Sequence, residues 1–194
     1  MSASTPSLLA AAREAAAHQH YPQGALYMVA TPIGNLADIG LRALQVLSLA
    51  DTVACEDTRH TQSMLRAYGI DKSASQLLAL HQHNERGAAE KVIALLQEGK
   101  NVALVTDAGT PAVSDPGAVL VEAVRNAGFR VIPIPGASAA VTALSASGLS
   151  APHFLFYGFL PNKSGARRTA LQALIEHPYT LVFYEAPHRI LECT

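Results

Sequence analysis

The sequence contains no apolar run long enough to cross a membrane. A bilayer-spanning helix needs ~20 consecutive apolar residues, and no stretch of this chain approaches that length. The short apolar stretch from Leu8 to Ala12 also lacks the length and the basic start of a signal peptide. We therefore expect a cytoplasmic protein that does not associate with a membrane.

Cysteine is scarce, with only Cys55 and Cys193 among 194 residues. The first lies in an apolar stretch and the second near the end of the sequence, which is not the spacing of a disulfide framework or a zinc site. This usage is typical of proteins in a reducing cytosol.

Charge is scarce as well, since 15% of the residues are charged and the formal net charge is -1. The charge of the whole chain neither attracts it to nucleic acid nor forbids a local basic patch. It therefore does not select a class of substrate. The apolar fraction of 49% is that of a globular protein with a sizeable core, in one domain or in one domain and part of a second.

Two nucleotide-binding motifs are missing. No Gly-x-Gly-x-x-Gly follows the first predicted strand, and the chain has no Gly-x4-Gly-Lys-Ser/Thr. These absences argue against a cofactor that is held by its pyrophosphate.

Residues 1–23 are rich in alanine and hold few large apolar side chains. We expect them to form a flexible extension. A mitochondrial presequence is the alternative, but the single Arg13 and the acidic Glu14 argue against it.

From Leu26 onward, short aliphatic runs alternate with longer amphipathic stretches. This alternation predicts an α/β fold, in which a mostly parallel five-stranded sheet is joined by crossover helices. The predicted strands are Leu26–Ala30, Thr52–Ala54, Leu77–His81, Val102–Thr106 and Val131–Ile134.

Two crossover helices carry local signals at their ends. Apolar residues from Ala89 to Leu96 recur at helical spacing, and Gly99 follows where that helix should stop. In the next helix, Asp115 and Pro116 have the residue types of an N-cap and a first helical position, and Gly128 predicts the end.

A change of composition at Gly148 to Pro152 predicts a domain boundary. We expect an N-terminal α/β domain over residues 24–149. Residues 150–194 contain two strand-like runs around a helical segment, which we interpret as the start of a second, incomplete α/β domain.

Polar, glycine-rich and proline-rich loops follow all five predicted strands. Ligands of open parallel sheets bind at the carboxyl ends of the strands, so these loops form the candidate site. Each loop alone also fits a structural role, because glycine and proline mark turns and residues such as Ser138 or Asp115 cap helices. The loops are Thr31–Asn35, Glu56–His60, His81–Glu85, Asp107–Pro111 with Asp115–Gly117, and Pro135–Ser138.

Two of these loops suggest particular chemistry. Asp107 directly follows an apolar strand, and Gly109 lets a ligand approach the backbone closely. His81 and His83 would share a face if the strand continued that far, and with Glu85 or His60 they could form a metal site. We expect no metal, because basic residues adjoin these histidines, and we assign them to substrate contacts instead.

Several segments resemble one family. Val29–Asp38, Glu56–His60, Leu104–Pro111 and Phe159–Pro161 are similar to the ribosomal RNA small-subunit methyltransferase I group of the tetrapyrrole methylase superfamily. The likeness runs from about Gly24 to Thr194. It implies two α/β domains, S-adenosyl-L-methionine as cofactor, a homodimer, and methyl transfer to the ribose 2'-hydroxyl of a cytidine in the decoding region of small-subunit (16S) ribosomal RNA. The chain departs from the family by ending early.

The resemblance also implies which residues form the site. The cofactor-binding residues are expected to be Thr31, Pro32, Gly34, Asp107, Ala108, Gly109, Thr110, Ser138, Phe159 and Leu160. Contacts to the RNA substrate are expected from Arg59, His60, His81, His83 and Asn84.

A ribose hydroxyl is a poor nucleophile, so a carboxylate or imidazole that takes its proton would help the reaction. We predict Glu56 and Asp57 for this catalytic role, and Asp57 has capping of the following helix as its structural alternative. His60, His83, Glu85, Glu185 and His188 are further candidates. A methylase of tetrapyrrole rings and a cofactor-binding fragment without catalysis are the alternative functions.

Overall fold

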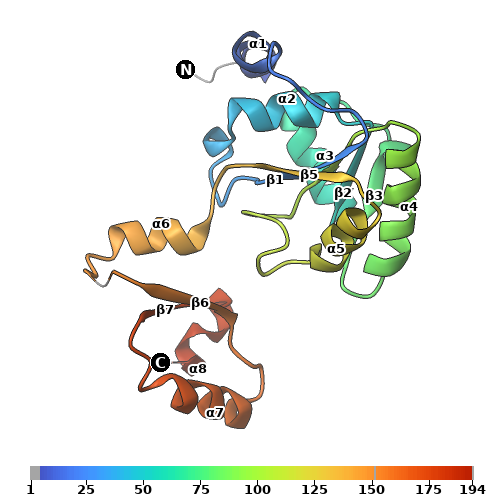
Figure 1. Cartoon of the computed structure of the whole chain (residues 1–194). Helices are drawn as coiled ribbons and strands as arrows, with labels where there is room; N and C mark the ends of the chain where they lie inside the picture. The colour runs from blue at the N-terminus through green and yellow to red at the C-terminus, as the bar shows by residue number, and fades with distance from the viewer. Residues whose placement is uncertain (1–4, 151, 194) are drawn as a thin grey trace. The chain divides into compact units, whose positions relative to one another are not determined.

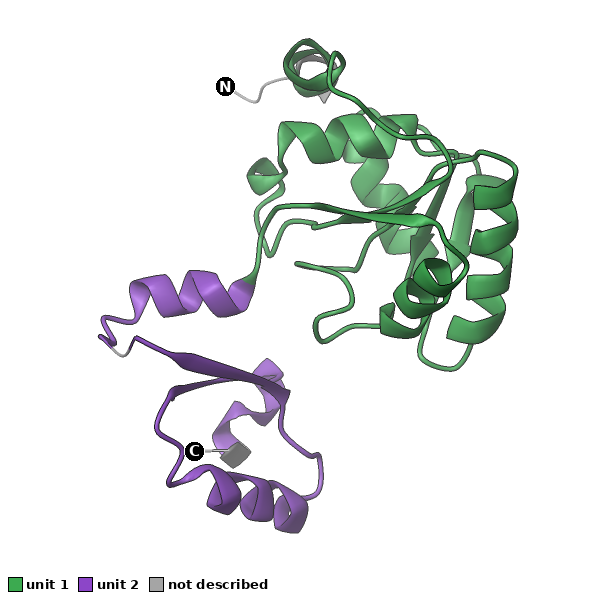
Figure 2. Cartoon of the chain, in the orientation of Figure 1, with its two compact units in different colours: residues 1–138 green, residues 139–194 purple. Residues whose placement is uncertain are grey.

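A computed structural model describes residues 5–150 and 152–193 of the chain. Its contacts divide the chain into two compact units, residues 1–138 and 139–194 (Figure 2). The composition change predicted a boundary between residues 149 and 150. The division in the structure lies earlier, so helix α6 (Ala139–Ala146) belongs to the second unit. Residue 151, beside the predicted boundary, lies outside the described residues.

The first unit contains the predicted α/β sheet (Figure 1). Its elements are α1 (Thr5–Ala16), β1 (Ala25–Val29), η1 (Leu36–Asp38), α2 (Leu41–Leu49), β2 (Thr52–Cys55), α3 (Thr58–Ala67), η2 (Ala74–Gln76), β3 (Leu77–Ala79), α4 (Glu85–Gln97), β4 (Val102–Leu104), α5 (Ala118–Asn126) and β5 (Arg130–Ile134). The five strands are all parallel, in the order β3-β2-β4-β1-β5. This confirms the predicted fold class.

Two strands end earlier than predicted. β3 ends at Ala79 and β4 at Leu104, whereas the sequence predicted strands to His81 and Thr106. One further backbone bond extends each ladder, because Leu80 N donates to the Cys55 carbonyl at 2.8 Å and Val105 N to the Ala54 carbonyl at 2.9 Å. Beyond these bonds the chain turns away into the loops of the candidate site.

Alternate residues of the strands bury two separate cores. Side chains such as Tyr27, Val53 and Cys55 pack with α2 and α3 on one face of the sheet. Their neighbours Leu26 and Ala54 pack with α4 and α5 on the other face. The central strands are therefore apolar on both sides, as expected for a parallel sheet covered by helices.

The chain reverses its direction across the sheet after β3. The connections from β1 to β3 run toward one edge with α2 and α3 on one face, and those from β3 to β5 run back with α4 and α5 on the other. The segments that follow the adjacent strands β1 and β4 therefore lead to helices on opposite faces of the sheet. Such a reversal opens a crevice at the carboxyl ends of the strands, where ligands of α/β sheets bind.

The alanine-rich N-terminal segment differs from the flexible extension that we expected. Residues 5–16 form α1, which packs on α2, and Ala12 and Ala16 are buried. Tyr21 continues this packing by donating its hydroxyl to the Ala16 carbonyl at 2.9 Å. Small alanine side chains let two helices approach closely, so few large apolar residues were needed. The first four residues of the predicted extension lie outside the described residues.

The start of α5 also differs from the prediction. The helix begins at Ala118, with Gly117 as its N-cap at a φ of 135°, and not at Pro116 after an Asp115 cap. A Cβ atom on Gly117 would lie 2.9 Å from Leu104 Cδ2. Close contact with β4 and a positive φ therefore require glycine here, and the helix starts after it.

The second unit is a smaller α/β segment. It consists of α6 (Ala139–Ala146), β6 (Phe154–Phe159), α7 (Ser164–Leu174), β7 (Thr180–Tyr184), η3 (Pro187–Arg189) and α8 (Ile190–Cys193). α7 lies between the two strands, as the sequence predicted, and β6 and β7 pair in parallel. In the part of the chain that the structure describes, no helix is long and apolar enough to span a membrane.

Candidate active site

The loops after β1 and β4 are joined by their backbones. Thr31 N donates to the Gly109 carbonyl at 2.9 Å, and Gly109 N donates to the Thr31 carbonyl at 3.0 Å. The buried Thr31 hydroxyl also donates to the Thr106 carbonyl at 3.0 Å. Two segments that were predicted to bind the cofactor therefore form one rigid unit.

The loop after β5 is attached to the same unit. The Thr110 hydroxyl donates to the Ala137 carbonyl at 3.1 Å, beside Ser138. Gly109 has a φ of 89°, a conformation that glycine adopts without strain. At Gly136 a Cβ atom would lie only 2.8 Å from Ala30 Cβ, so this loop packs directly on the end of β1.

An open cavity of about 530 Å³ lies beside these joined loops. It brings together four predicted cofactor residues and one predicted RNA contact. Its lining consists of Pro32, Ile33, Gly34, Asn35, Leu36, His60, Ser63, Met64, Ala67, Asp107 and Ala108. Thr31, Gly109, Thr110 and Ser138 do not line the cavity, and the first three of them hold its loops through the hydrogen bonds above.

One wall of the cavity is a face of α3, of which sequence analysis assigned only His60. His60, Ser63, Met64 and Ala67 recur at intervals of three or four, which is the spacing of one helix face. This periodicity was visible in the sequence, but nothing in it showed that the face meets the loop after β1.

Tyr68 connects α3 to that loop. Its hydroxyl donates to the Leu36 carbonyl at 2.8 Å, and burial raises the pKa of Tyr68 to about 12. The phenol therefore stays protonated and keeps donating across the neutral pH range.

Glu56 lies at the end of β2 among other acidic groups. Partial burial, followed by the negative charges of Asp107 and Asp115, raises the pKa of Glu56, and nearby His81 opposes this shift. A carboxylate whose pKa is raised is a better proton acceptor near neutral pH than an ordinary one. Glu56 is exposed and does not line the 530 Å³ cavity, so its role as a general base stays a prediction.

Asp57 has a structural role. Its Oδ1 accepts hydrogen bonds from Arg59 N at 2.7 Å and His60 N at 3.1 Å, which caps α3. Both bonds lower the pKa of Asp57, and the bond from His60 N has the larger effect. Asp57 therefore has the capping role that was its structural alternative.

The loop after β3 lies apart from the main cavity. His83 and Asn84 line a second cavity of about 300 Å³, with Glu85, Arg86 and their neighbours. Asn84 also folds its own loop, since its side chain accepts from His81 N at 2.8 Å and donates to the Ala79 carbonyl at 3.0 Å. RNA contacts of this loop stay a prediction.

The two histidines of this loop do not lie on a strand, because β3 ends at Ala79. Their rings meet edge to face with centroids 6.2 Å apart, and both side chains are exposed. Among the described residues, no group of three or more His, Cys, Asp or Glu side chains is placed to hold a metal ion.

The profile of the tetrapyrrole (corrin/porphyrin) methylases matches residues 25–194. The chain belongs to this family. It is 56% identical over 170 residues to the ribosomal RNA small subunit methyltransferase I of Escherichia coli O157:H7, covering 88% of this chain and 58% of that relative. The relative of the same name from Mesorhizobium japonicum is 56% identical over 168 residues, covering 87% of this chain and 56% of the relative. The chain thus spans somewhat more than half the length of these relatives.

Solved structures of tetrapyrrole methylases share the fold. Uroporphyrin-III-C-methyltransferase from Thermus thermophilus is 26% identical with a TM-score of 0.53, covering 77% of this chain and 72% of its own. Cobalt precorrin-4 methyltransferase has a TM-score of 0.55 at 20% identity, covering 75% of this chain and 62% of its own, which shows the fold alone.

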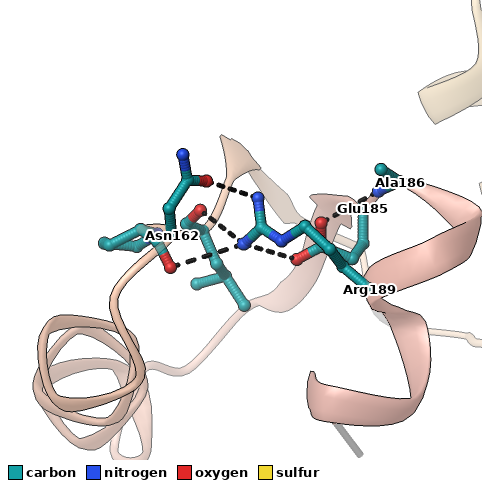
Figure 3. A network of polar contacts seen from close by, with 6 residues as sticks. Asn162, Glu185, Ala186 and Arg189 are labelled. Atoms are coloured by element: carbon teal, nitrogen blue, oxygen red, sulfur yellow. Dashed lines mark hydrogen bonds and ion pairs between the residues drawn. The ribbon is translucent and has the colours of Figure 1, made fainter.

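The second unit of the chain carries the remaining site predictions. Phe159 is half exposed at the end of β6, and Leu160 is buried. Arg189 donates to the Leu160 carbonyl at 3.5 Å and to Asn162, and it forms an ion pair with Glu185 at 3.3 Å (Figure 3). The carboxylate of Glu185 is thereby paired, and His188 is exposed.

Proposed function

We propose that the protein is an S-adenosyl-L-methionine-dependent methyltransferase that modifies the ribose 2'-hydroxyl of a cytidine in the decoding region of small-subunit ribosomal RNA. The observation that carries the proposal is the identity of 52–56% to several relatives named ribosomal RNA small subunit methyltransferase I. We further propose that it acts in the cytoplasm and as a homodimer.

The residues of the 530 Å³ cavity fit such a cofactor. The volume is within the ~300–1,000 Å³ of small-molecule sites. Ile33 and Met64 offer apolar surface for an adenine ring, and the exposed Asp107 offers a carboxylate for a cationic group. The cofactor, when bound, supplies an activated methyl group on a sulfonium. The protein therefore has to hold the partners in line and exclude water.

Glu56 is the proposed general base. The ribose hydroxyl would have to give up its proton when it accepts the methyl group that the cofactor would supply. The hydroxyl proton passes to the Glu56 carboxylate, whose raised pKa favours this transfer. His60 lines the wall of the cavity, which supports a role for it in orienting the RNA.

A methylase of tetrapyrrole rings is the second candidate, favoured by the 26% identity to uroporphyrin-III-C-methyltransferase. The two are separated by incubating the complete protein that contains this chain with radiolabelled S-adenosyl-L-methionine. One reaction holds unmethylated small ribosomal subunits and the other holds uroporphyrinogen III. We expect label in ribosomal RNA at a ribose, found by nuclease mapping. Label in the macrocycle alone would reject the proposal.

A further inference from the structure

The N-terminus of α5 is capped by a residue from another helix. Gly117, at the N-cap, has no side chain with which to cap the helix. Instead, Glu85 Oε2 accepts from Gly117 N and from Val119 N, each at 3.2 Å. A carboxylate at a helix N-terminus is stabilised both by these charge-assisted bonds and by the helix dipole.

Glu85 comes from the loop that we propose to contact RNA. It is the first residue of α4 and precedes Gly117 by 32 positions. The neighbouring Asn84 bonds back to His81 N and the Ala79 carbonyl. Two adjacent residues therefore make separate contacts, because Asn84 bonds to the end of β3 and Glu85 bonds to the start of α5.

The segment that ends at Gly117 directly follows Asp107 and Ala108, the two residues of the loop after β4 that line the cavity. Its first part is fixed by the Thr31–Gly109 bridge and by the bond from Thr110 to Ala137. In its middle, Ala112 adopts a positive φ of 63° and Val113 is 55% exposed. The two bonds to Glu85 hold the far end.

We propose that Glu85 is a positioning residue that fixes the segment from Gly109 to Gly117 and couples the His81–Asn84 loop to cofactor binding. This rests on the proposed function and on the predicted RNA contacts of the His81–Asn84 loop, with S-adenosyl-L-methionine bound beside Asp107 and Ala108. RNA that orders the loop also orders Glu85, and the segment beyond it then favours the bound cofactor. Such coupling is reciprocal, so cofactor also strengthens RNA binding.

The test compares three variants of the complete protein. Glu85→Ala removes the acceptor, and Glu85→Gln keeps an amide oxygen at the same place. Glu90→Ala makes the same truncation at an exposed position of the same helix, for which no hydrogen bond or ion pair is found among the described residues. Calorimetry measures the dissociation constant of S-adenosyl-L-methionine with and without small ribosomal subunit RNA. Hydrogen exchange measures protection of the Gly117 and Val119 amides.

We expect RNA to tighten cofactor binding of the parent protein and of Glu90→Ala by ~10-fold, within the usual range of coupling. The Glu85→Ala variant should lose this coupling. Its Gly117 and Val119 amides should exchange ~10-fold faster, as removal of a charged acceptor predicts. Glu85→Gln should recover most of both effects. A purely structural cap would lower thermal stability and leave the RNA effect unchanged, which would overturn the proposal.

The proposed function can fail separately. If the parent protein binds no S-adenosyl-L-methionine, that function is wrong, and the coupling falls with it. Amide exchange still decides whether Glu85 positions the segment, because unchanged protection in Glu85→Ala would reject the contact itself.

Discussion

Two sets of loops at one edge of the sheet are built in different ways. The loops after β1, β4 and β5 are held mainly by backbone contacts, such as the Thr31–Gly109 bridge and the close approach of Gly136 to Ala30. The loops after β2 and β3 are held by side chains, since Asp57 caps α3 and Asn84 folds the other loop. One set depends on glycine and the other on polar caps.

This difference predicts how each set responds to substitution. A larger side chain at a glycine in the loops after β1, β4 or β5 would be strained or would clash, so the whole loop would have to move. Loss of a capping side chain in the loops after β2 or β3 removes one or two hydrogen bonds, and water replaces part of them. We therefore expect large losses of function from substitutions in the loops after β1, β4 and β5. Substitutions in the loops after β2 and β3 should cause smaller losses.

The largest effect is expected from Gly109→Val. A valine would be strained at a φ of 89°, and its Cβ would contact Ile33 Cγ2 at 3.5 Å. Strain of ~1–3 kcal/mol in this loop should weaken S-adenosyl-L-methionine binding by roughly 100-fold. Calorimetry measures the affinity, and circular dichroism checks that the sheet persists. Gly165→Val is the control, because that glycine has open space and no positive φ; equal affinities of the two variants would contradict the contrast.

Glu56→Gln should give the next largest effect, on catalysis alone. The amide cannot accept the ribose proton, so kcat for RNA methylation should fall roughly 100-fold while cofactor affinity is kept. Single-turnover kinetics with calorimetry separates the two quantities. In the parent protein the rate should rise with pH through the raised pKa of Glu56, and this step should be absent in the variant. A variant of unchanged kcat would remove Glu56 from the mechanism.

A smaller effect is expected from Tyr68→Phe, which removes the hydrogen bond to the Leu36 carbonyl. Loss of one such bond should lower the free energy of unfolding by about 1 kcal/mol, measured by urea denaturation. Because Leu36 lines the cavity, cofactor affinity should also fall a few-fold. Tyr27→Phe removes a similar bond, from Tyr27 to the Pro22 carbonyl at 2.7 Å, away from the cavity. It should lose stability without losing affinity, and a similar loss of affinity in both would show that Leu36 is not positioned by Tyr68.

The smallest effect concerns the pH dependence of stability at Glu56. Its folded-state pKa is raised, so the ionised carboxylate opposes folding above the pKa that it has in the unfolded chain. Glu56→Gln should therefore be at least as stable as the parent protein at pH 7. The difference should vanish as the pH falls below both pKa values. Urea denaturation at pH 7 and at low pH measures this, and a variant that is less stable at pH 7 would show that Glu56 makes a favourable contact instead.

The positions of the loops after β1, β4 and β5 could largely be predicted from local sequence. Apolar runs located all five strands, and the glycines and prolines after them located the loops. Apart from His60, the face of α3 in the cavity was not assigned, because its contact with Leu36 arises only when α3 folds beside the loop after β1. The packing of α1 on α2 was missed for a similar reason, since its small residues gain burial only from a partner helix.

The sequence by itself determined the α/β class, the carboxyl edge as the candidate site, and the cap of α3, because each follows from neighbours along the chain. Asp57 reaches amides only two and three positions away. The start of α5 was decided by the tertiary structure. Asp115 looked like its cap, yet contact between Gly117 and β4 fixed the start, and the acceptor came from Glu85, 32 positions earlier. A local sequence pattern cannot reveal such an acceptor, because only the packing of α4 beside α5 brings that carboxylate to the helix.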